Sequence, residues 1–352
     1  MNALLVVVGI AGMFLLLIAP HEAGHFAFAK LFKVRVLEFS IGAGTKLWSA
    51  TRGGTLYAIR ALPILGYVRM GGMEAGDFED PSGFHRKAAW QRILILVAGP
   101  LANFLVAIVI VTGVELTQLN TDPGRIFTVL PGTPAAAAGL RVDDSVRSVD
   151  GQPITHVGQV RDVEAGAPGQ PLVLSGVHSN GRPFTVTVTP LQKSDGTWQI
   201  GIGMPRRLIG WQTAITDGVT FPIVATVGIV GGLGQLITGQ VPGGLFGPQG
   251  VTGPIGMADV AQQAVGLGFT TYLGFVALLS VALGFTNLLP LLALDGGRVV
   301  VVLIEVVRRR PFNRATELNV QRFGLVALLG LAAVISVLDI QRIATGQFPG
   351  LR

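Results

Sequence analysis

The sequence predicts a polytopic α-helical membrane protein with about four transmembrane helices and one inserted extramembrane domain. Half of the 352 residues are hydrophobic and only 13% are charged, whereas soluble proteins carry about 25% charged residues. The hydrophobic residues gather in long uncharged runs, separated by one central stretch with scattered charges. This composition excludes a disordered chain, which needs low hydrophobicity, and a single soluble domain would expose large apolar patches. The chain has no cysteine, which excludes disulfides and cysteine-ligated metals.

Four uncharged apolar runs are candidates for membrane-spanning helices. The first covers residues 4–20, and the second covers residues 93–114, which is long enough to cross the roughly 30 Å of bilayer hydrocarbon. The third run, residues 272–294, ends at Asp295, and the fourth covers residues 323–338. We therefore expect residues 1–114 and 271–352 to contribute two transmembrane helices each.

The central stretch, residues 115–207, is typical of a small soluble domain. Short β-branched runs predict strands, and the dipeptide Asn180-Gly181 predicts a tight hairpin turn between two of them. The expected strands cover residues 125–130, 145–149, 171–177 and 183–189. About 90 residues of this kind suffice for one domain.

Residues 208–270 connect the inserted domain to the third apolar run. Their uncharged part, residues 219–239, is rich in glycine and polar near its end, and residues 241–256 are a Gly/Pro-rich loop. We expect a juxtamembrane amphipathic segment that lies along the membrane surface or packs beside the helices. A fifth crossing at residues 219–239 is the alternative.

The distribution of charge predicts which side of the membrane each part occupies. Residues 30–92 hold ten Lys/Arg against five Asp/Glu, and residues 308–322 hold five Arg against one Glu. Residues 115–217 hold eight basic and nine acidic residues. Because cytoplasmic loops carry an excess of Lys and Arg, four crossings place the two basic loops in the cytoplasm, and the inserted domain and both termini outside it. The net charge of +6 is thus a topology signal, and basic residues spread over two loops predict no nucleic-acid partner.

The strongest chemical motif is His21-Glu22-Ala23-Gly24-His25, an H-E-x-x-H sequence. Residues four apart lie on one face of a helix, so both imidazoles can bind one zinc ion. Glu22 then lies beside the metal and can accept a proton from water. The motif follows directly after the first apolar run, and ionisable groups in a membrane segment usually mark function.

Two histidines leave a zinc site incomplete, because catalytic zinc usually has three protein ligands. Asp295 is the candidate third ligand, since a helix that enters from outside over the third apolar run reaches it at a membrane depth similar to that of the histidine pair. The alternative for Asp295 is a helix N-cap. The remaining histidines are expected to be surface or packing residues, and they are His85, His156 and His178.

With these residues, the chain resembles the site-2 protease family of intramembrane zinc metalloproteases, which includes the bacterial regulator-of-sigma-E protease. The family's second motif, N-x-x-P-x-x-x-x-D-G, is matched by Asn287, Pro290, Asp295 and Gly296. Further matches are Ser40-Ile-Gly-Ala-Gly44, Ala98-Gly99-Pro100 with Asn103, and Gly253-Pro254-Ile255-Gly256. Together these matches span most of the chain outside the inserted domain.

The resemblance adds two elements to the expected fold. Residues 36–70 would form a membrane-associated, reentrant β-hairpin that contains the family's G-x-G stretch, although the usual Gly-Gly-Tyr is Leu65-Gly66-Tyr67 here. The inserted domain resembles a PDZ domain at Thr133-Pro134-Ala135, Ala138-Gly139-Leu140 and Val149-Asp150-Gly151. It has room for one PDZ domain, whereas the sigma-E protease has two.

The resemblance implies hydrolysis of peptide bonds within the membrane. His21, His25 and Asp295 would hold zinc, and Glu22 would be the general base and later protonate the leaving amine. The family's substrates are single-pass membrane proteins, such as anti-sigma factors and signal-peptide remnants. The expected location is the bacterial cytoplasmic membrane, with membrane lipid around the helices.

Substrate handling is predicted at two places. The implied substrate-binding residues are Asn287, Pro290, Gly42 and Gly44. A substrate helix must unwind locally before it is cut, and the edge of a β-loop over residues 39–70 could pair with the unwound segment, which is the β-augmentation mode. The inserted domain could admit substrates by size or bind a new C-terminal carboxylate.

Two other functions were compatible with a membrane protein of this composition. A non-enzymatic membrane scaffold that presents a PDZ domain requires both motifs to carry no chemistry. An ion transporter that uses Glu22 and Asp295 is disfavoured, because the sequence has no internal inverted repeat.

Overall fold

The computed structural model describes residues 3–74, 76–193, 196–348 and 350, and the chain divides into two compact units. The inserted unit comprises Glu115–Ile215, and the helical unit comprises Met1–Val114 and Thr216–Arg352. The helical unit is therefore built from two segments of chain that are separated in sequence by the inserted unit.

Five helices in the described residues are long and apolar enough to cross a membrane. They are α1 (Ala3–Leu31), α2 (Ala89–Leu116), α5 (Trp211–Ile237), α7 (Phe269–Leu288) and α9 (Arg314–Ala344). The four apolar runs of the sequence lie in α1, α2, α7 and α9, with the third run extending past the end of α7. Helix α5 contains most of the uncharged stretch that was expected to be a juxtamembrane segment. The chain is thus a polytopic α-helical membrane protein.

Helices α1 and α7 run in the same direction. Near the start of α7, the Tyr272 hydroxyl donates a hydrogen bond to the Gly9 carbonyl near the start of α1 (2.8 Å). Beyond the end of α7, Asp295 lies beside the histidine pair of α1. Helix α2 runs the other way, from Gly99 beside the histidine pair to Ala107, which packs against α7. This parallel arrangement brings two chemical motifs that are far apart in sequence to the same end of the helical unit.

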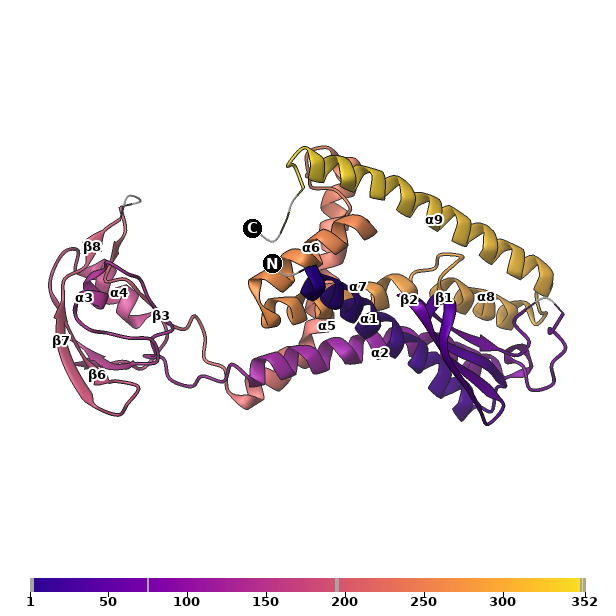
Figure 1. Ribbon diagram of the computed structural model, residues 1–352, viewed down its shortest axis with the longest axis horizontal. Coiled ribbons are helices and arrows are strands. Elements are labelled where there is room, and N and C mark those ends of the chain that lie inside the picture. The colour runs from indigo at the N-terminus through magenta and orange to yellow at the C-terminus, as the bar shows by residue number, and fades with distance from the viewer. Residues whose placement is uncertain (1–2, 75, 194–195, 349, 351–352) are drawn as a thin grey trace. The chain divides into compact units, whose positions relative to one another are not determined.

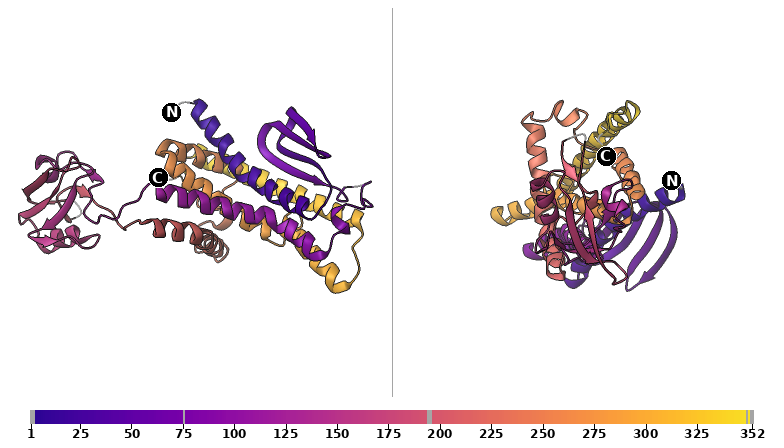
Figure 2. Two further views of the ribbon diagram at one scale, coloured as in Figure 1. Left: turned by 90° about the horizontal axis from the view of Figure 1, so that it is seen from below. Right: turned by 90° about the vertical axis from the view of Figure 1, so that its left-hand side faces the viewer.

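Helix α5 takes a different direction from these three helices. Within the helical unit it runs steeply across α2, as Figures 1 and 2 both show. Its first turns lie beside the last turns of α2, where a Cβ added to Gly218 would clash with Thr112. A short 3-10 turn, η2 (Gly244–Phe246), and helix α6 (Pro254–Leu267) follow it. Helix α5 is therefore as long and apolar as a membrane-spanning helix, but its direction differs from that of α1, α2 and α7.

The third apolar run is interrupted just before Asp295. Helix α7 ends at Leu288, and the residue before Pro290 is extended, which is the conformation that a following proline favours. Helix α8 (Asp295–Arg308) then begins at Asp295. A Cβ on Gly296 would clash with the carbonyl oxygens that end α7, so glycine permits α8 to start close against them. Pro290 and Gly296 thus account for the break between the two helices.

The predicted hairpin over residues 36–70 is present as β1 (Val36–Arg52) and β2 (Thr55–Met70). The two strands pair with several register shifts, and residues 38–41 have partners on both sides. Four stretches therefore lie side by side, in the order 66–70, 36–41, 55–60 and 46–52. The stretch 66–70 forms the edge of the sheet that faces α1, and α1 packs mainly against β2.

A buried ion-pair cluster joins α2, α8 and α9. The Glu305 carboxylate accepts hydrogen bonds from Arg92 (2.7 Å), from Arg314 (2.7 Å) and from the backbone N–H of Phe312 (2.8 Å). Burial works against the charged carboxylate, but the hydrogen bonds from Arg92 and Phe312 outweigh it and hold the pKa of Glu305 below its ordinary value. A short 3-10 turn, η1 (Phe84–Arg86), precedes α2 and lies near this cluster.

The inserted unit is a small α+β fold around one hydrophobic core. Its main sheet has the order β5-β4-β6-β7, and two further strand pairs are β3–β10 and β8–β9. The strands are β3 (Thr128–Val129), β4 (Ser145–Val149), β5 (Gln152–Pro153), β6 (Leu172–Val177), β7 (Pro183–Val188), β8 (Leu191–Gln192), β9 (Trp198–Gln199) and β10 (Ile202–Gly203). The helices are α3 (Pro134–Ala137) and α4 (Gln159–Gly166).

Most strand predictions for this unit are confirmed. Strand β4 has the predicted bounds, and β6 and β7 differ from theirs by one residue each. Gly181 has a φ of 83°, in the left-handed region, as the predicted Asn-Gly turn requires. The strand expected over residues 125–130 is only Thr128–Val129, because it pairs with a partner strand of two residues.

Candidate metal centre and active site

Helix α1 presents the H-E-x-x-H motif at the end that meets α2 and α8. His21 and His25 are four residues apart and both are buried, so their imidazoles project from one face of the helix. The Nδ1 atom of His25 donates a hydrogen bond to the carbonyl oxygen of Ile95 in α2 (2.8 Å). This bond selects the tautomer in which His25 Nε2 has no proton and can act as a ligand.

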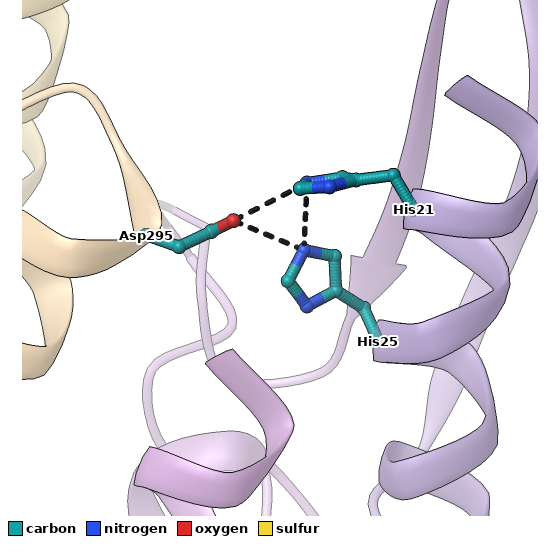
Figure 3. A group of neighbouring side chains, drawn as sticks. All are labelled: His21, His25 and Asp295. Carbon is teal, nitrogen blue, oxygen red and sulfur yellow. Dashed lines mark hydrogen bonds and ion pairs between the residues drawn. The ribbon is translucent and has the colours of Figure 1, made fainter. Parts of the chain in front are cut away.

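Three ligand atoms converge between α1 and α8 (Figure 3). His21 Nε2 lies 3.2 Å from His25 Nε2, and Asp295 Oδ2 lies 3.3 Å from the first and 3.2 Å from the second. Among the residues that the structure describes, this is the one group of three or more histidine or acidic side chains that could hold a metal ion. The N-cap alternative for Asp295 is wrong, since the N-cap of α8 is Leu294 and Asp295 is the first residue of the helix.

The triangle of ligand atoms fits a zinc ion. Ligands at about 2.0 Å from a tetrahedral zinc lie about 3.3 Å from one another, which matches all three separations. A hydrogen bond joins only two of the three ligand atoms and leaves the third without a partner. A metal ion, in contrast, binds all three ligand atoms at once. Two imidazoles and one carboxylate are also a donor set that catalytic zinc uses.

The site depends on a close approach between α1 and α2. A Cβ on Gly99 of α2 would clash with the imidazole of His25, and a Cβ on Gly24 of α1 would clash with the carbonyl oxygen of Ala98. Both glycines are therefore needed for the two backbones to come this near. This contact also lets His25 reach the Ile95 carbonyl one helical turn earlier in α2.

Glu22 faces the edge strand of the hairpin. A Cβ on Gly66 would lie 3.0 Å from Glu22 Cγ, and the backbone of Val68 is a hydrogen-bond partner of the Glu22 carboxylate. Gly66 is the one glycine kept from the family's Gly-Gly-Tyr in this region. Glu22 therefore lies between the histidine pair and residues 66–70.

A polar cluster holds the same edge strand in place. The Glu38 carboxylate of β1 accepts hydrogen bonds from Arg60 (2.7 Å) and from the Tyr67 hydroxyl (2.8 Å). Burial works against the charged form of Glu38, but these two hydrogen bonds outweigh it and lower the pKa of the carboxylate. Arg60 also donates to Ser40 (2.9 Å) and to the carbonyl of Gly44 (2.8 Å). Tyr67 is thus fixed beside the catalytic groups.

A cavity of about 330 Å³ opens onto these groups. Its lining includes His21, Glu22, His25, Asn287, Asp295 and Arg298, and also the edge residues Gly66, Tyr67 and Val68. The structure therefore brings together five of the eight residues that the sequence singled out. The Asn287 side chain makes no hydrogen bond with the described residues and is available to a ligand.

The other three candidate residues do not line this cavity. Pro290 is exposed in the connection between α7 and α8. Gly42 and Gly44 lie where β1 bends, with φ values of 93° and 82° that favour glycine. The bend in β1 therefore gives a structural reason for glycine at positions 42 and 44. The assignment of Pro290, Gly42 and Gly44 to substrate binding stays a prediction.

None of the other histidines belongs to this group of candidate metal ligands. His178 is paired with Asp144 (2.8 Å), and His156 is an exposed residue near Asp162. His85 is in η1, where burial, Arg314 and Arg92 lower its pKa to about 3.

The sequence analysis did not identify Arg298, which lines the cavity. Its position three residues after Asp295 in a helix was a signal that could have identified it.

Comparisons with known proteins show the family to which the chain belongs. The model of Peptidase family M50 matches residues 9–331. A relative from Clostridium perfringens is 33% identical over 332 residues, covering 92% of this chain and 95% of its own. Zinc metalloprotease RasP from Geobacillus kaustophilus is 30% identical (92% and 94% covered), and RasP from Bacillus licheniformis is 28% identical (92% and 96% covered).

Solved structures also match part of the chain, and one example is a PDZ domain. The PDZ domain of an SdrC-like protein from Listeria innocua is 20% identical, with a TM-score of 0.23, and the match covers 25% of this chain and all of that one. The family assignment rests on the family model and on the relatives that extend over more than nine tenths of the chain. The chain therefore belongs to Peptidase family M50, the site-2 protease family of intramembrane zinc metalloproteases.

Proposed function

We propose that the cavity between α1, the hairpin edge and α8 is the active site of this zinc metalloprotease. His21, His25 and Asp295 hold the zinc ion, and Glu22 is the general base. The observation that carries the assignment is the near-equilateral triangle of ligand atoms, 3.2 to 3.3 Å on each side. The three ligands come from two helices, and His25 and Asp295 are 270 residues apart in sequence.

The geometry assigns a step to each side chain. A zinc ion held here supplies a Lewis acid that polarises the scissile carbonyl and lowers the pKa of water. Glu22 accepts a proton from the attacking water and delivers it to the leaving amine when the peptide bond breaks. The Ile95 carbonyl keeps His25 in the ligand tautomer, and Asn287 offers an amide to the substrate backbone.

The edge strand is suited to hold an unwound substrate segment. Residues 66–70 have a strand partner on one side only, and their other side faces Glu22. A substrate paired along this edge would lie extended beside the catalytic base, since main-chain hydrogen bonds give affinity in β-augmentation. Pairing of this kind replaces the helical hydrogen bonds that the substrate loses when it unwinds.

The preferred topology has four crossings, with both termini and the inserted unit outside the cytoplasm. The parallel direction of α1 and α7 and the steep course of α5 support it. The histidine pair and Asp295 then lie towards the cytoplasmic side of the bacterial membrane. Substrates are single-pass membrane proteins of the anti-sigma-factor or signal-peptide-remnant kind, and the inserted unit is a PDZ-like domain that acts on their outer part.

The experiment compares cells that carry the wild type with cells that carry Glu22→Gln. The variant loses the base but keeps all three zinc ligands, so we expect a single-pass membrane protein to accumulate while the zinc content of the purified variant equals that of the wild type. Glu79→Gln is the matched control, because its carboxylate is 89% exposed. A membrane proteome that is the same in all three strains would contradict the proposal and favour a scaffold.

A further inference from the structure

Arg298 lies on the same face of α8 as the candidate zinc ligand Asp295. The two residues are three apart in a regular helix, so their side chains are neighbours. Arg298 lines the same cavity as His21, Glu22 and His25. It is the one lysine or arginine among the lining residues, which include two carboxylates.

The guanidinium of Arg298 has no protein partner in the part of the chain that the structure describes. Its side chain takes part in no hydrogen bond or ion pair, and its Nε atom is buried without a partner. Two neighbouring arginines differ in this respect, since Arg92 and Arg314 are both paired with Glu305 at 2.7 Å. The ion-pair cluster around Glu305 therefore includes Arg92 and Arg314 but not Arg298.

The carboxylates around Arg298 are already engaged by other groups. Asp295 is paired with the histidine pair, and Glu305 and Glu317 are paired with other arginines. His85 is close enough to Arg298 for the two to interact, but its low pKa of about 3 keeps it neutral. A half-buried guanidinium without an acceptor is costly in an apolar environment, and five N–H donors remain to be satisfied. Arg298 lines this cavity and also a second one between α8 and α9. Of the two, the first contains the candidate catalytic groups, and it is there that a bound substrate can supply an oxygen acceptor.

The charge balance of the cavity indicates which oxygen atom accepts the hydrogen bonds of Arg298. Glu22 and Asp295 together carry two negative charges, which one divalent cation offsets. When Glu22 accepts a proton from the attacking water it becomes neutral, and the negative charge moves to the oxygen of the peptide carbonyl. A preorganised cation aimed at charge that develops during the reaction is a strong source of catalysis in a site that excludes water.

We propose that Arg298 is a catalytic residue that donates hydrogen bonds to the carbonyl oxygen of the scissile peptide and stabilises the negative charge that forms there. The proposal rests on the proposed function of the same cavity. It involves no proton transfer from Arg298, because a guanidinium stays protonated in proteins. Glu22 carries out both proton transfers of the reaction.

The test compares Arg298→Met and Arg298→Lys with Arg308→Met in lipid nanodiscs. Arg308 is the matched control, since it lies in the same helix but is exposed. The probe is a fluorescence-labelled peptide that contains the transmembrane segment of the protein that accumulates with Glu22→Gln. A phosphinic peptide of the same sequence, which imitates the tetrahedral intermediate, measures transition-state binding. Zinc content and thermal midpoint are recorded for each variant.

We expect Arg298→Met to lower kcat about 100-fold, the usual effect of removing one such donor, with KM within threefold of the control. The affinity for the phosphinic peptide should fall by a similar factor, while zinc content and thermal midpoint stay unchanged. Arg298→Lys should retain part of the activity, because lysine keeps the charge but not the planar fork of donors.

Two results would overturn the inference about Arg298 but leave the proposed function intact. One is a kcat of Arg298→Met within threefold of Arg308→Met, and the other is a loss of activity that follows a loss of zinc or of thermal stability. If neither the wild type nor Arg308→Met cleaves the peptide although both hold zinc, the proposed function fails, and the inference fails with it.

Discussion

Gly99 shows how strongly one backbone position in α2 controls the candidate zinc site. Its Cα faces the imidazole of His25, and a side chain there would occupy the space of that ring. The ring is held from the same helix, because the Ile95 carbonyl accepts the proton of His25 Nδ1 (2.8 Å). One turn of α2 therefore provides both the space and the hydrogen bond that orient this ligand.

We expect Gly99→Ala to weaken zinc binding about 10- to 100-fold, the range found when the orientation of a ligand is disturbed. The added methyl group displaces the His25 ring away from Asp295. Gly113→Ala is the matched control, because it lies in the same helix with nothing within 4 Å of the added Cβ. Zinc affinity is measured by chelator competition on the purified proteins. Equal affinity in the two variants would mean that α1 and α2 can separate without loss of the site.

The edge strand is the part of the hairpin that we propose to bind substrate, and the strand pairing shows which positions test this role. Val68 lies on the edge and pairs with Phe39 alone. Ala58, in contrast, pairs with Ser40 on one side and with Ser49 on the other. A proline at Ala58 would break the interior of the sheet, so only changes in residues 66–70 probe the edge itself.

We expect Val68→Pro to reduce cleavage at least about tenfold while the zinc content is unchanged, since proline removes the N–H that faces Glu22 and one donor of the edge. Ala50→Pro, on the opposite edge of the same sheet, is the control and should retain most of the activity. Both variants are assayed with the same membrane substrate. Full activity of Val68→Pro, or an equal loss in both variants, would speak against substrate pairing along residues 66–70.

At the scale of the whole molecule, the inserted unit is closed at its base. The backbones of Asn120 and Ile209 exchange two hydrogen bonds (3.0 and 2.7 Å) where the chain enters and leaves the unit. The buried residues of its core all lie between Ile126 and Ile200. The helical unit has separate apolar clusters of its own. We therefore expect the packing around the candidate zinc site to be independent of the inserted unit.

We expect deletion of residues 121–208, with a short Gly/Ser linker in their place, to leave the zinc content unchanged. The cleavage pattern then distinguishes the two roles proposed for the inserted unit. Cleavage of a substrate with an intact outer part indicates that the domain excludes large substrates. Loss of cleavage of a trimmed substrate indicates that it captures the new C-terminal carboxylate. A lower zinc content would contradict the independence of the two units.

Local patterns in the chain made a large part of the site predictable. The histidine pair depends only on helical spacing, and the third ligand followed from a second motif at the end of an apolar run. The break before Asp295 was predictable from Pro290 and the adjacent glycines, because these residues restrict the backbone locally. Gly42 and Gly44 could not be judged in the same way, since they serve a bend in β1 and lie away from the cavity lining.

The sequence by itself determined the class of the protein, its apolar helices and the chemistry of its motifs, because hydropathy and short-range spacing express those properties directly. Only the tertiary structure decided that α5 crosses α2 steeply and that residues 66–70 are the edge beside Glu22. It also decided that Arg298 has no partner among the residues that the structure describes. These properties depend on contacts between segments that are distant in sequence. Such contacts are set by the packing of whole elements, which no local pattern records.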